Sequence, residues 1–295
     1  IVEIIRKLPN TDISIEVIDG YKLIVSTDNT EFNLNGINPN EFPNLDLDET
    51  KEPIVINNGI FKDIINQTVF ATSQSETRPL LTGINFRIVG NSFEVLATDS
   101  YRLALKKHKL TKSVNNSADI IIPSKNLSEL LKLLTSSDDE SIEMHLFSNK
   151  VIFKFNNILF QSRLINGTYP NTKNLIPSES LFDLKLDTNE FYSMVDRASI
   201  LNNDNDNNII TLEIKNNLLK ITSMSLEIGK VEEKMSVDCN NSIKISFSAK
   251  YMMDALRTIN SKNVVLTFVG EIKPILLNND DSEDLVCLIL PIRTY

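Results

Sequence analysis

The feature of this chain that most restricts its fold is an internal repeat of short helix-and-strand units. Apolar residues at positions i, i+3, i+4 and i+7, which mark one face of a helix, occur in residues 1–8, 127–134 and 252–259. Each copy is followed by alternating apolar residues, over 13–17, 142–146 and 264–268, as in a half-buried strand. We call this unit B, and the pattern predicts three copies of it.

A second unit, A, alternates with unit B. The segments "FKDIINQT" (61–68) and "FYSMVDRA" (191–198) share a helical apolar spacing, and the strand patterns after them also correspond. The order B, A, B, A, B is typical of a repeated architecture, because chance similarity between amphipathic helices would not produce strict alternation. Pairing the units predicts one domain at 51–178 and another at 179–295. Residues 1–50 are then a B unit without its A partner, so that the chain is expected to start inside a helix.

Composition narrows the class of protein. The chain has 295 residues, of which 41% are hydrophobic, so it is globular and large enough for two or three domains. No apolar run is long enough to cross a bilayer, and the first residues given do not have the pattern of a signal peptide, so none is expected. Cys239 and Cys287 lack the spacing of a zinc site or a disulfide framework. We therefore expect a cytoplasmic protein.

The stretch "ATDSYRLAL" (97–105) places Asp99, Ser100, Tyr101 and Arg102 between two apolar runs. Catalysis would need a base, a nucleophile and an orienting group in one cleft. The chain has only two histidines, neither in a motif, and it lacks the phosphate-loop, zinc-protease and nucleophile-elbow motifs. Residues 203–208 lack the glycine and final glutamate of a calcium loop. We predict a binding rim here and no catalytic residues.

Two alternatives stay open at this point. One is an enzyme that uses Asp99 as its base, although nothing in the sequence indicates a substrate. The other is a structural repeat protein of the adhesin type, which predicts a secretory signal and no binding groove. Binding of a short peptide at the polar stretch would distinguish both from a docking protein.

Four segments resemble the beta sliding clamp family of bacterial DNA polymerase III. They are "RPLLTGINF" (78–86), "ATDSYRLAL" (97–105), "NGTYPNTKNLIP" (166–177) and "LILPIR" (288–293), in the order and spacing of that family. The resemblance covers the whole chain and implies the α+β DNA-clamp fold of helix-plus-antiparallel-sheet units. Two complete clamp domains and the second half of a first domain are then expected. No cofactor and no metal are implied.

The resemblance also implies the function of a processivity factor. The family's clamps encircle duplex DNA as head-to-tail dimers, and they tether the replicative polymerase so that it rebinds before it diffuses away. The polymerase, the clamp loader and repair proteins dock through short peptides in a groove between the second and third domains. This chain is accordingly expected to form a homodimer when its first domain is complete.

Matching the motifs residue by residue places the peptide groove on three parts of the chain. Its predicted members are Leu81, Thr98, Ser100, Tyr101, Arg102, Leu103, Pro170, Asn174, Leu175, Ser248, Tyr251, Ile272, Pro274, Leu288, Ile289, Leu290, Pro291, Ile292 and Arg293. The aliphatic members are equally compatible with a plain core. The family often has glycine at the position of Ser100, a basic residue at Asn174, and methionine at Leu290 and Ile292. These departures predict an altered turn and a less pliable pocket.

The remaining predictions concern DNA and the dimer contact. A net charge of −9 argues against a tight nucleic-acid binder, but a ring holds DNA by topology and needs only a weak basic lining that reads no bases. The predicted DNA-facing residues are Lys62, Arg78, Lys125, Lys132, Arg197, Lys250 and Arg257, each of which could equally be an ordinary solvated side chain. The predicted dimer contact joins Phe32 and Leu34 to Ile200 and Leu201, with Ile4 nearby; these are alternatively core residues of their own units.

Overall fold

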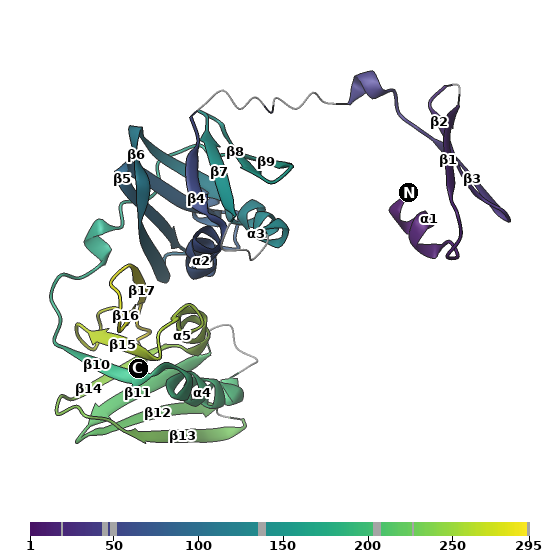
Figure 1. Cartoon of the computed structure of the whole chain (residues 1–295). Coiled ribbons are helices and arrows are strands. Elements are labelled where there is room, and N and C mark those ends of the chain that lie inside the picture. Colours follow the sequence, from purple (N-terminus) through teal and green to yellow (C-terminus); the bar gives the residue numbers. More distant parts are fainter. Residues whose placement is uncertain are drawn as a thin grey trace. The chain divides into compact units, whose positions relative to one another are not determined.

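The computed structural model covers the whole chain and describes residues 1–18, 20–42, 47, 52–134, 140–202, 208–225 and 227–293. The chain divides into two compact units, Ile1–Asp48 and Glu49–Tyr295 (Figure 1). The predicted domain boundary at residues 50 and 51 lies outside the described residues, as does most of the polar segment 203–208. Among the described residues, no helix is long and apolar enough to cross a membrane.

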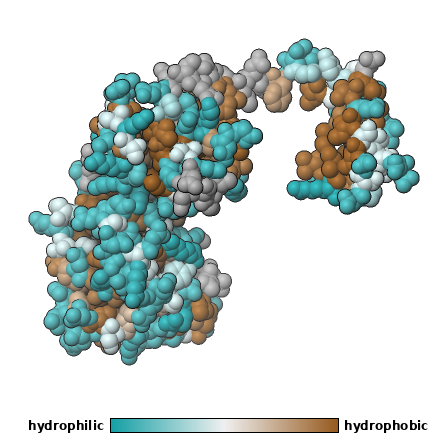
Figure 2. Space-filling model, in the orientation of Figure 1, coloured by the Kyte–Doolittle hydropathy of each residue, from teal (hydrophilic) through white to brown (hydrophobic). Residues whose placement is uncertain are grey.

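The first unit consists of one helix and one small sheet. Helix α1 (Val2–Lys7) precedes an antiparallel sheet of β1 (Ser14–Ile18), β2 (Lys22–Thr27) and β3 (Thr30–Asn35), in that order. A single 3-10 turn, Pro39–Glu41, follows. The predicted helix and strand of the first B unit are thus confirmed. Of the large apolar side chains described here only Val25 is buried, and Figure 2 shows an apolar face on this unit.

The second unit contains two repeats, each with a strand, a helix, antiparallel strands, a second helix and three further strands. The first repeat consists of β4 (Ile54–Asn57), α2 (Asn58–Val69), β5 (Gly83–Thr98), β6 (Arg102–Pro123), α3 (Ser124–Leu133), β7 (Ser141–Leu146), β8 (Lys150–Phe155) and β9 (Ile158–Arg163). The second repeat consists of β10 (Phe182–Asp187), α4 (Thr188–Ser199), β11 (Ile209–Lys215), β12 (Leu218–Ser225), β13 (Gly229–Ser236), β14 (Ile243–Ser248), α5 (Ala249–Leu256), β15 (Asn263–Phe268), β16 (Ile275–Asn279) and β17 (Leu285–Ile289).

Local sequence explains where these helices begin and which face they bury. Asn57 and Asp187, at matching positions of the two repeats, each accept a hydrogen bond from a backbone N–H of the first helical turn. Ser248 caps α5 in the same way. The apolar faces predicted for α2, α3, α4 and α5 turn into the core, where Phe61, Phe191 and Met252 are almost completely buried. Each such side chain contributes about 1.5–3 kcal/mol through burial.

One detail of the strand prediction differs from the structure. The sequence indicates two separate strands in the first A unit, at 84–88 and 93–95, matching 210–214 and 219–221. In the second repeat a turn at Asn216 and Asn217, with φ of 54° and 57°, separates β11 from β12. In the first repeat β5 continues through the matching point at Gly90, whose φ is 58°, because Gly90 pairs with Val114 of β6.

A sheet joins the two repeats. Two four-stranded sheets, β4-β7-β8-β9 and β13-β12-β11-β14, belong to one repeat each. The third has the order β10-β15-β16-β17-β6-β5, so that strands of both repeats share it. The joint is the antiparallel pairing of β17 with β6, from Leu285 opposite Lys106 to Ile289 opposite Arg102. The polar stretch at 99–102 therefore lies at the end of this joint.

Candidate functional site

The turn between β5 and β6 is held by its own side chains. The Asp99 Oδ1 atom accepts hydrogen bonds from the backbone N–H groups of Tyr101 (2.9 Å) and Arg102 (3.0 Å). The Thr98 hydroxyl donates to the Arg102 carbonyl oxygen (2.7 Å) and accepts from the Ser100 N–H (3.1 Å). Asp and Thr commonly stabilise turns in this way. These local contacts shape the backbone of the turn.

Ser100 occupies an unusual backbone conformation in this turn. Its φ is 81°, a left-handed region that glycine adopts freely and serine does not. The Ser100 hydroxyl accepts a hydrogen bond of 2.8 Å from Nη1 of Arg78. Arg78, predicted to face DNA, therefore reaches the rim of this turn from the loop before β5. That Ser100 alters the turn stays a prediction.

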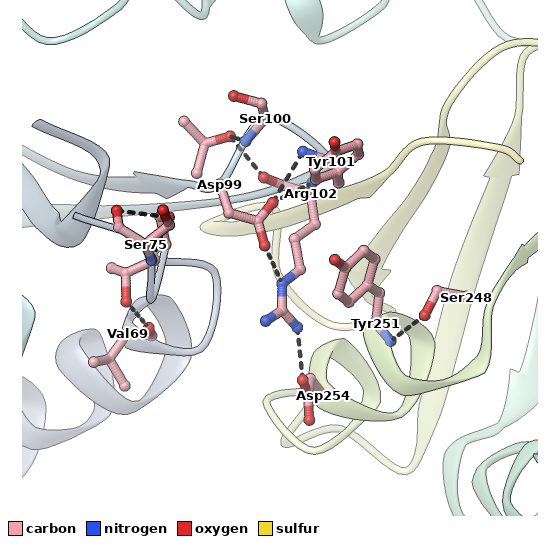
Figure 3. Close-up of polar contacts among 12 residues, drawn as sticks. Val69, Ser75, Asp99, Ser100, Tyr101, Arg102, Ser248, Tyr251 and Asp254 are labelled. Carbon is pink, nitrogen blue, oxygen red and sulfur yellow. Dashed lines mark hydrogen bonds and ion pairs between the residues drawn. The ribbon is translucent and has the colours of Figure 1, made fainter. Parts of the chain in front are cut away.

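Arg102 connects the turn to the second repeat (Figure 3). Its Nε donates to Oδ2 of Asp99 at 3.0 Å, and its Nη1 donates to Oδ2 of Asp254 in α5 at 2.6 Å. The guanidinium lies over the ring of Tyr251, 4.4 Å from the centroid, and 5.4 Å from the ring of Phe70. Only 9% of the residue is exposed. Arg102 is thus held between two carboxylates and two rings at the joint of the repeats.

Tyr169 supports the turn from the connector between the repeats, and sequence reasoning did not select it. Its hydroxyl accepts from the Thr98 N–H at 3.1 Å and donates to the Gly83 carbonyl oxygen at 3.5 Å. Burial raises the pKa of the Tyr169 hydroxyl above its ordinary value. The only signal in the sequence was its place beside the predicted groove residue Pro170.

Several predicted groove residues meet beside the turn. The Leu290 N–H donates to the Tyr101 carbonyl oxygen (2.9 Å), and the Ile292 N–H donates to the Ser246 carbonyl oxygen of β14 (2.7 Å). The C-terminal segment therefore runs between the turn and the strand that ends at Ser248. Tyr101 is 62% exposed and Leu290 is 37% exposed, so apolar surface stays open here.

The other predicted members divide by burial. Leu81, Thr98, Leu103, Ser248, Leu288 and Ile289 are buried; Leu103 and Leu288 form a small core cluster with Leu276. Tyr251, Pro274, Pro291 and Ile292 are half-buried, and Asn174, Leu175, Ile272 and Arg293 are exposed. Pro170 lines a cavity of about 630 Å³ together with Leu96, Leu105 and Tyr169.

The predicted DNA-facing residues lie on the four helices of the second unit or beside them. Most of them contact acidic or polar groups: Lys62 with the Leu134 carbonyl oxygen, Lys125 with Glu76, Lys132 with Glu129, Arg197 with Glu233, and Arg257 with Asp254 and Tyr192. Lys250 is in the first turn of α5. The hydrogen bond from Arg197 lowers the pKa of the Glu233 carboxyl. Exposed pairs of this kind are weak and leave the cations accessible.

The predicted dimer residues are partly open in each unit taken by itself. Phe32 and Leu34 lie on β3 and are half-buried, as is Ile4 on α1. Ile200 and Leu201 form a 3-10 turn, Ile200–Asn202, after α4; Ile200 is 60% exposed. The same turn neighbours β12 and β13.

Metal-ligating and nucleophilic groups do not assemble in the described parts of the chain. Within those residues no group of His, Cys, Asp and Glu is arranged to hold a metal ion. Cys239 and Cys287 are both free and buried. Burial raises the pKa of the Cys287 thiol to about 12, which leaves it protonated and unreactive.

Family models of the DNA polymerase III beta subunit match nearly the whole chain. The N-terminal domain model matches residues 1–46, the central domain model residues 55–171, and the C-terminal domain model residues 173–293. The predicted boundary between 178 and 179 stays a prediction.

Individual relatives agree with the family models. The beta sliding clamp of Bacillus subtilis is 41% identical over 296 residues, which is 99% of this chain and 78% of the relative. The beta sliding clamp of Staphylococcus aureus is 41% identical over 298 residues, covering 100% of this chain and 78% of the relative. The crystal structure of the Bacillus subtilis clamp superposes with a TM-score of 0.93, over 99% of this chain and 78% of that one.

Proposed function

This chain belongs to the family of DNA polymerase III beta subunits, the beta sliding clamps, and on that premise we propose how it holds its partners. Its function is that of a DNA sliding clamp in replication, a processivity factor and not an enzyme. We propose that it acts in the cytoplasm as a head-to-tail ring around duplex DNA. Residues 1–50, 51–178 and 179–295 would form its successive domains.

The proposed docking site for partner proteins is the surface around Tyr101. There, a backbone hydrogen bond of 2.9 Å joins Tyr101 and Leu290, whose side chains are both exposed. Buried residues such as Leu103 and Leu288 lie in the strands beside them. Short peptide motifs bind such sites because a few apolar anchors enter a rigid pocket while polar groups fix their orientation. This rigid, exposed pair is the observation that carries the groove proposal. Replicative polymerase, clamp loader and repair proteins would bind it through such motifs.

Binding of a fluorescent Gln-Leu-x-Leu-Phe peptide, followed by anisotropy, tests the groove. The wild type should bind, and Tyr101→Ala should weaken binding at least tenfold, since the loss of an aromatic anchor costs about 2 kcal/mol or more. Ile228→Ala is the matched control, because Ile228 is 63% exposed but lies in the turn before β13. A wild type that fails to bind, or an Ile228 variant as weak as the Tyr101 variant, would exclude the groove.

The internal repeat supports a specific dimer contact. Strand β17, the last strand of a B unit, pairs with the β6 segment 102–106. The matching segment of the second repeat is β13, at the end of its sheet, and the matching last strand of the first B unit is β3. We propose that β3 of one subunit pairs with β13 of the next, which would bring Phe32 and Leu34 close to Ile200 and Leu201. Repetition of one contact by rotation closes a ring.

A further inference from the structure

A chain of polar contacts runs from the turn at 98–102 into the helices of the second repeat. The Asp99 carboxylate contacts Arg102, and Arg102 contacts Asp254. The other oxygen of Asp254, Oδ1, accepts from Nη1 of Arg257 at 3.3 Å. Arg257 in turn donates to the Tyr192 hydroxyl of α4 at 2.7 Å and 3.1 Å. We call Asp99, Arg102 and Asp254 the Arg102 bridge.

The two carboxylates of the bridge have different tasks. One oxygen of Asp99 accepts hydrogen bonds from the backbone N–H groups of Tyr101 and Arg102, which shapes the turn. The other oxygen accepts a hydrogen bond from the Arg102 guanidinium. Asp254 lies across the joint of the repeats and makes the shorter contact, 2.6 Å. Because the Arg102 side chain is only 10% exposed, loss of a carboxylate partner would leave its charge largely buried and incompletely paired. The location of the guanidinium therefore depends on Asp254.

The bridge also sets the positions of two side chains that face the peptide. The Tyr101 N–H donates to Asp99, which also contacts the Arg102 guanidinium, and the Tyr251 ring packs against that guanidinium. Tyr251 is half-buried, and burial raises the pKa of its hydroxyl. A displaced Arg102 would remove the contact on the Tyr251 ring and one partner of the Asp99 carboxylate that holds the Tyr101 N–H.

We infer that Asp254 is a positioning residue of the peptide groove: it holds Arg102, and through Arg102 it fixes the turn that presents Tyr101 and the ring of Tyr251. Asp254 itself is not a groove residue, since it acts from α5 through Arg102. The inference rests on the proposed peptide groove and adds to it a determinant on the opposite side of the joint.

The test compares peptide affinity in Asp254→Asn, Asp254→Glu and Asp280→Asn with that of the wild type. Asp254→Asn keeps the shape and removes the charge, and it should weaken peptide binding about tenfold, since hydrogen bonds between charged groups are the stronger kind. Asp254→Glu restores the charge and should recover part of the affinity. Asp280→Asn removes the same charge from a carboxylate that pairs with Lys185 at 2.7 Å, outside the bridge, and it should stay within about twofold of the wild type.

A spectroscopic readout separates positioning from general stability. The chain contains no tryptophan, so Tyr101→Trp places a single reporter on the turn. In that background Asp254→Asn should lower the steady-state anisotropy of the tryptophan at a temperature well below unfolding. If Asp254→Asn unfolds, Asp254→Ser, which also removes the carboxylate, is measured instead. Unchanged peptide affinity in that variant, and unchanged anisotropy in the Tyr101→Trp background, would overturn the inference.

The outcomes are distinguishable. A wild type that does not bind the peptide removes the groove and the inference together. A wild type that binds while Asp254→Asn binds equally well removes only the inference. An Asp280→Asn variant as weak as Asp254→Asn would attribute the effect to the loss of any paired carboxylate and would also overturn the inference.

Discussion

Single polar atoms determine the geometry of the turn at 98–102. The Tyr169 hydroxyl is the most telling of them, since it satisfies both the Thr98 N–H and the Gly83 carbonyl oxygen at the two ends of β5. Buried backbone groups that lose such a partner are costly. A tyrosine in a connector therefore supports a site to which it contributes no surface.

Tyr169→Phe tests this role in stability. The variant keeps the ring but leaves the Thr98 N–H without its hydrogen-bond acceptor. The free energy of unfolding, measured by urea denaturation, should therefore fall by about 1–2 kcal/mol. Tyr101→Phe, which removes an exposed hydroxyl, should leave it unchanged. Equal effects of the two substitutions would contradict the buried contact.

The same variant has an expected pH signature. The folded pKa of Tyr169 is raised above its unfolded value of about 10. Below about pH 10 the hydroxyl is protonated in the folded and the unfolded chain, and its contribution to folding stability is fully present. Above about pH 10 the hydroxyl ionises first in the unfolded chain, so this contribution is lost as the pH rises. The stability advantage of wild type over Tyr169→Phe should therefore shrink above pH 10.

At the scale of elements, what the sequence predicts and what it misses have separate physical causes. The helical faces, such as Phe61, Ile64 and Ile65, are predictable because a period of 3.6 residues is local. The matching strands of the A units are equally local. The pairing of β17 with β6, the contact of Arg102 with Asp254 and the hydrogen bond from Gln67 to the Thr258 carbonyl oxygen join residues far apart in the chain. No periodicity encodes such contacts.

The candidate site follows the same division. Resemblance to the family located the turn, yet it could not indicate that Arg102 is enclosed by Asp99 and Asp254, nor that Arg78 contacts Ser100. Those facts depend on side-chain reach across the joint of the repeats. The groove itself stays a prediction until a peptide is bound.

The element-scale prediction concerns the open end of the sheet at β13. If β3 of a second copy pairs there, Ile200→Glu places a charge in the contact and should weaken self-association at least tenfold in sedimentation velocity. Leu181→Glu is the matched control, because Leu181 is about as exposed as Ile200, at 64% and 60%, but it precedes β10, which lies in a different sheet from β13. Equal sedimentation of the two variants would exclude the proposed contact.

For the whole molecule, the distribution of charge matters more than its sum. The chain carries a net charge of −9, while its predicted DNA-facing cations lie on or beside helices and most contact neighbouring polar groups. Neighbouring carboxylates partly neutralise these cations, which is what we expect of a surface that attracts phosphates weakly and makes no base-specific contacts. The acidic remainder limits non-specific adhesion to nucleic acid.

Loss of two helix lysines tests this distribution. In a plot of log K for duplex DNA against log salt concentration, each phosphate contact contributes about 0.9 to the slope. The double variant Lys132→Gln, Lys250→Gln should therefore make this slope shallower by about 1.8. Lys109→Gln with Lys112→Gln changes the net charge equally, but on exposed positions of β6. If both pairs change the slope alike, only total charge matters and the helices have no special role.

The backbone ladder between β17 and β6 has a mechanical consequence. Opening the molecule at that place would break several main-chain hydrogen bonds and would expose the buried Arg102. An interface between separate chains can open without unfolding either chain. A molecule that must open to admit DNA is therefore expected to stay closed at the joint of the two repeats and to open at a contact between two chains. Amide protons of β17 should accordingly be among the slowest to exchange with solvent.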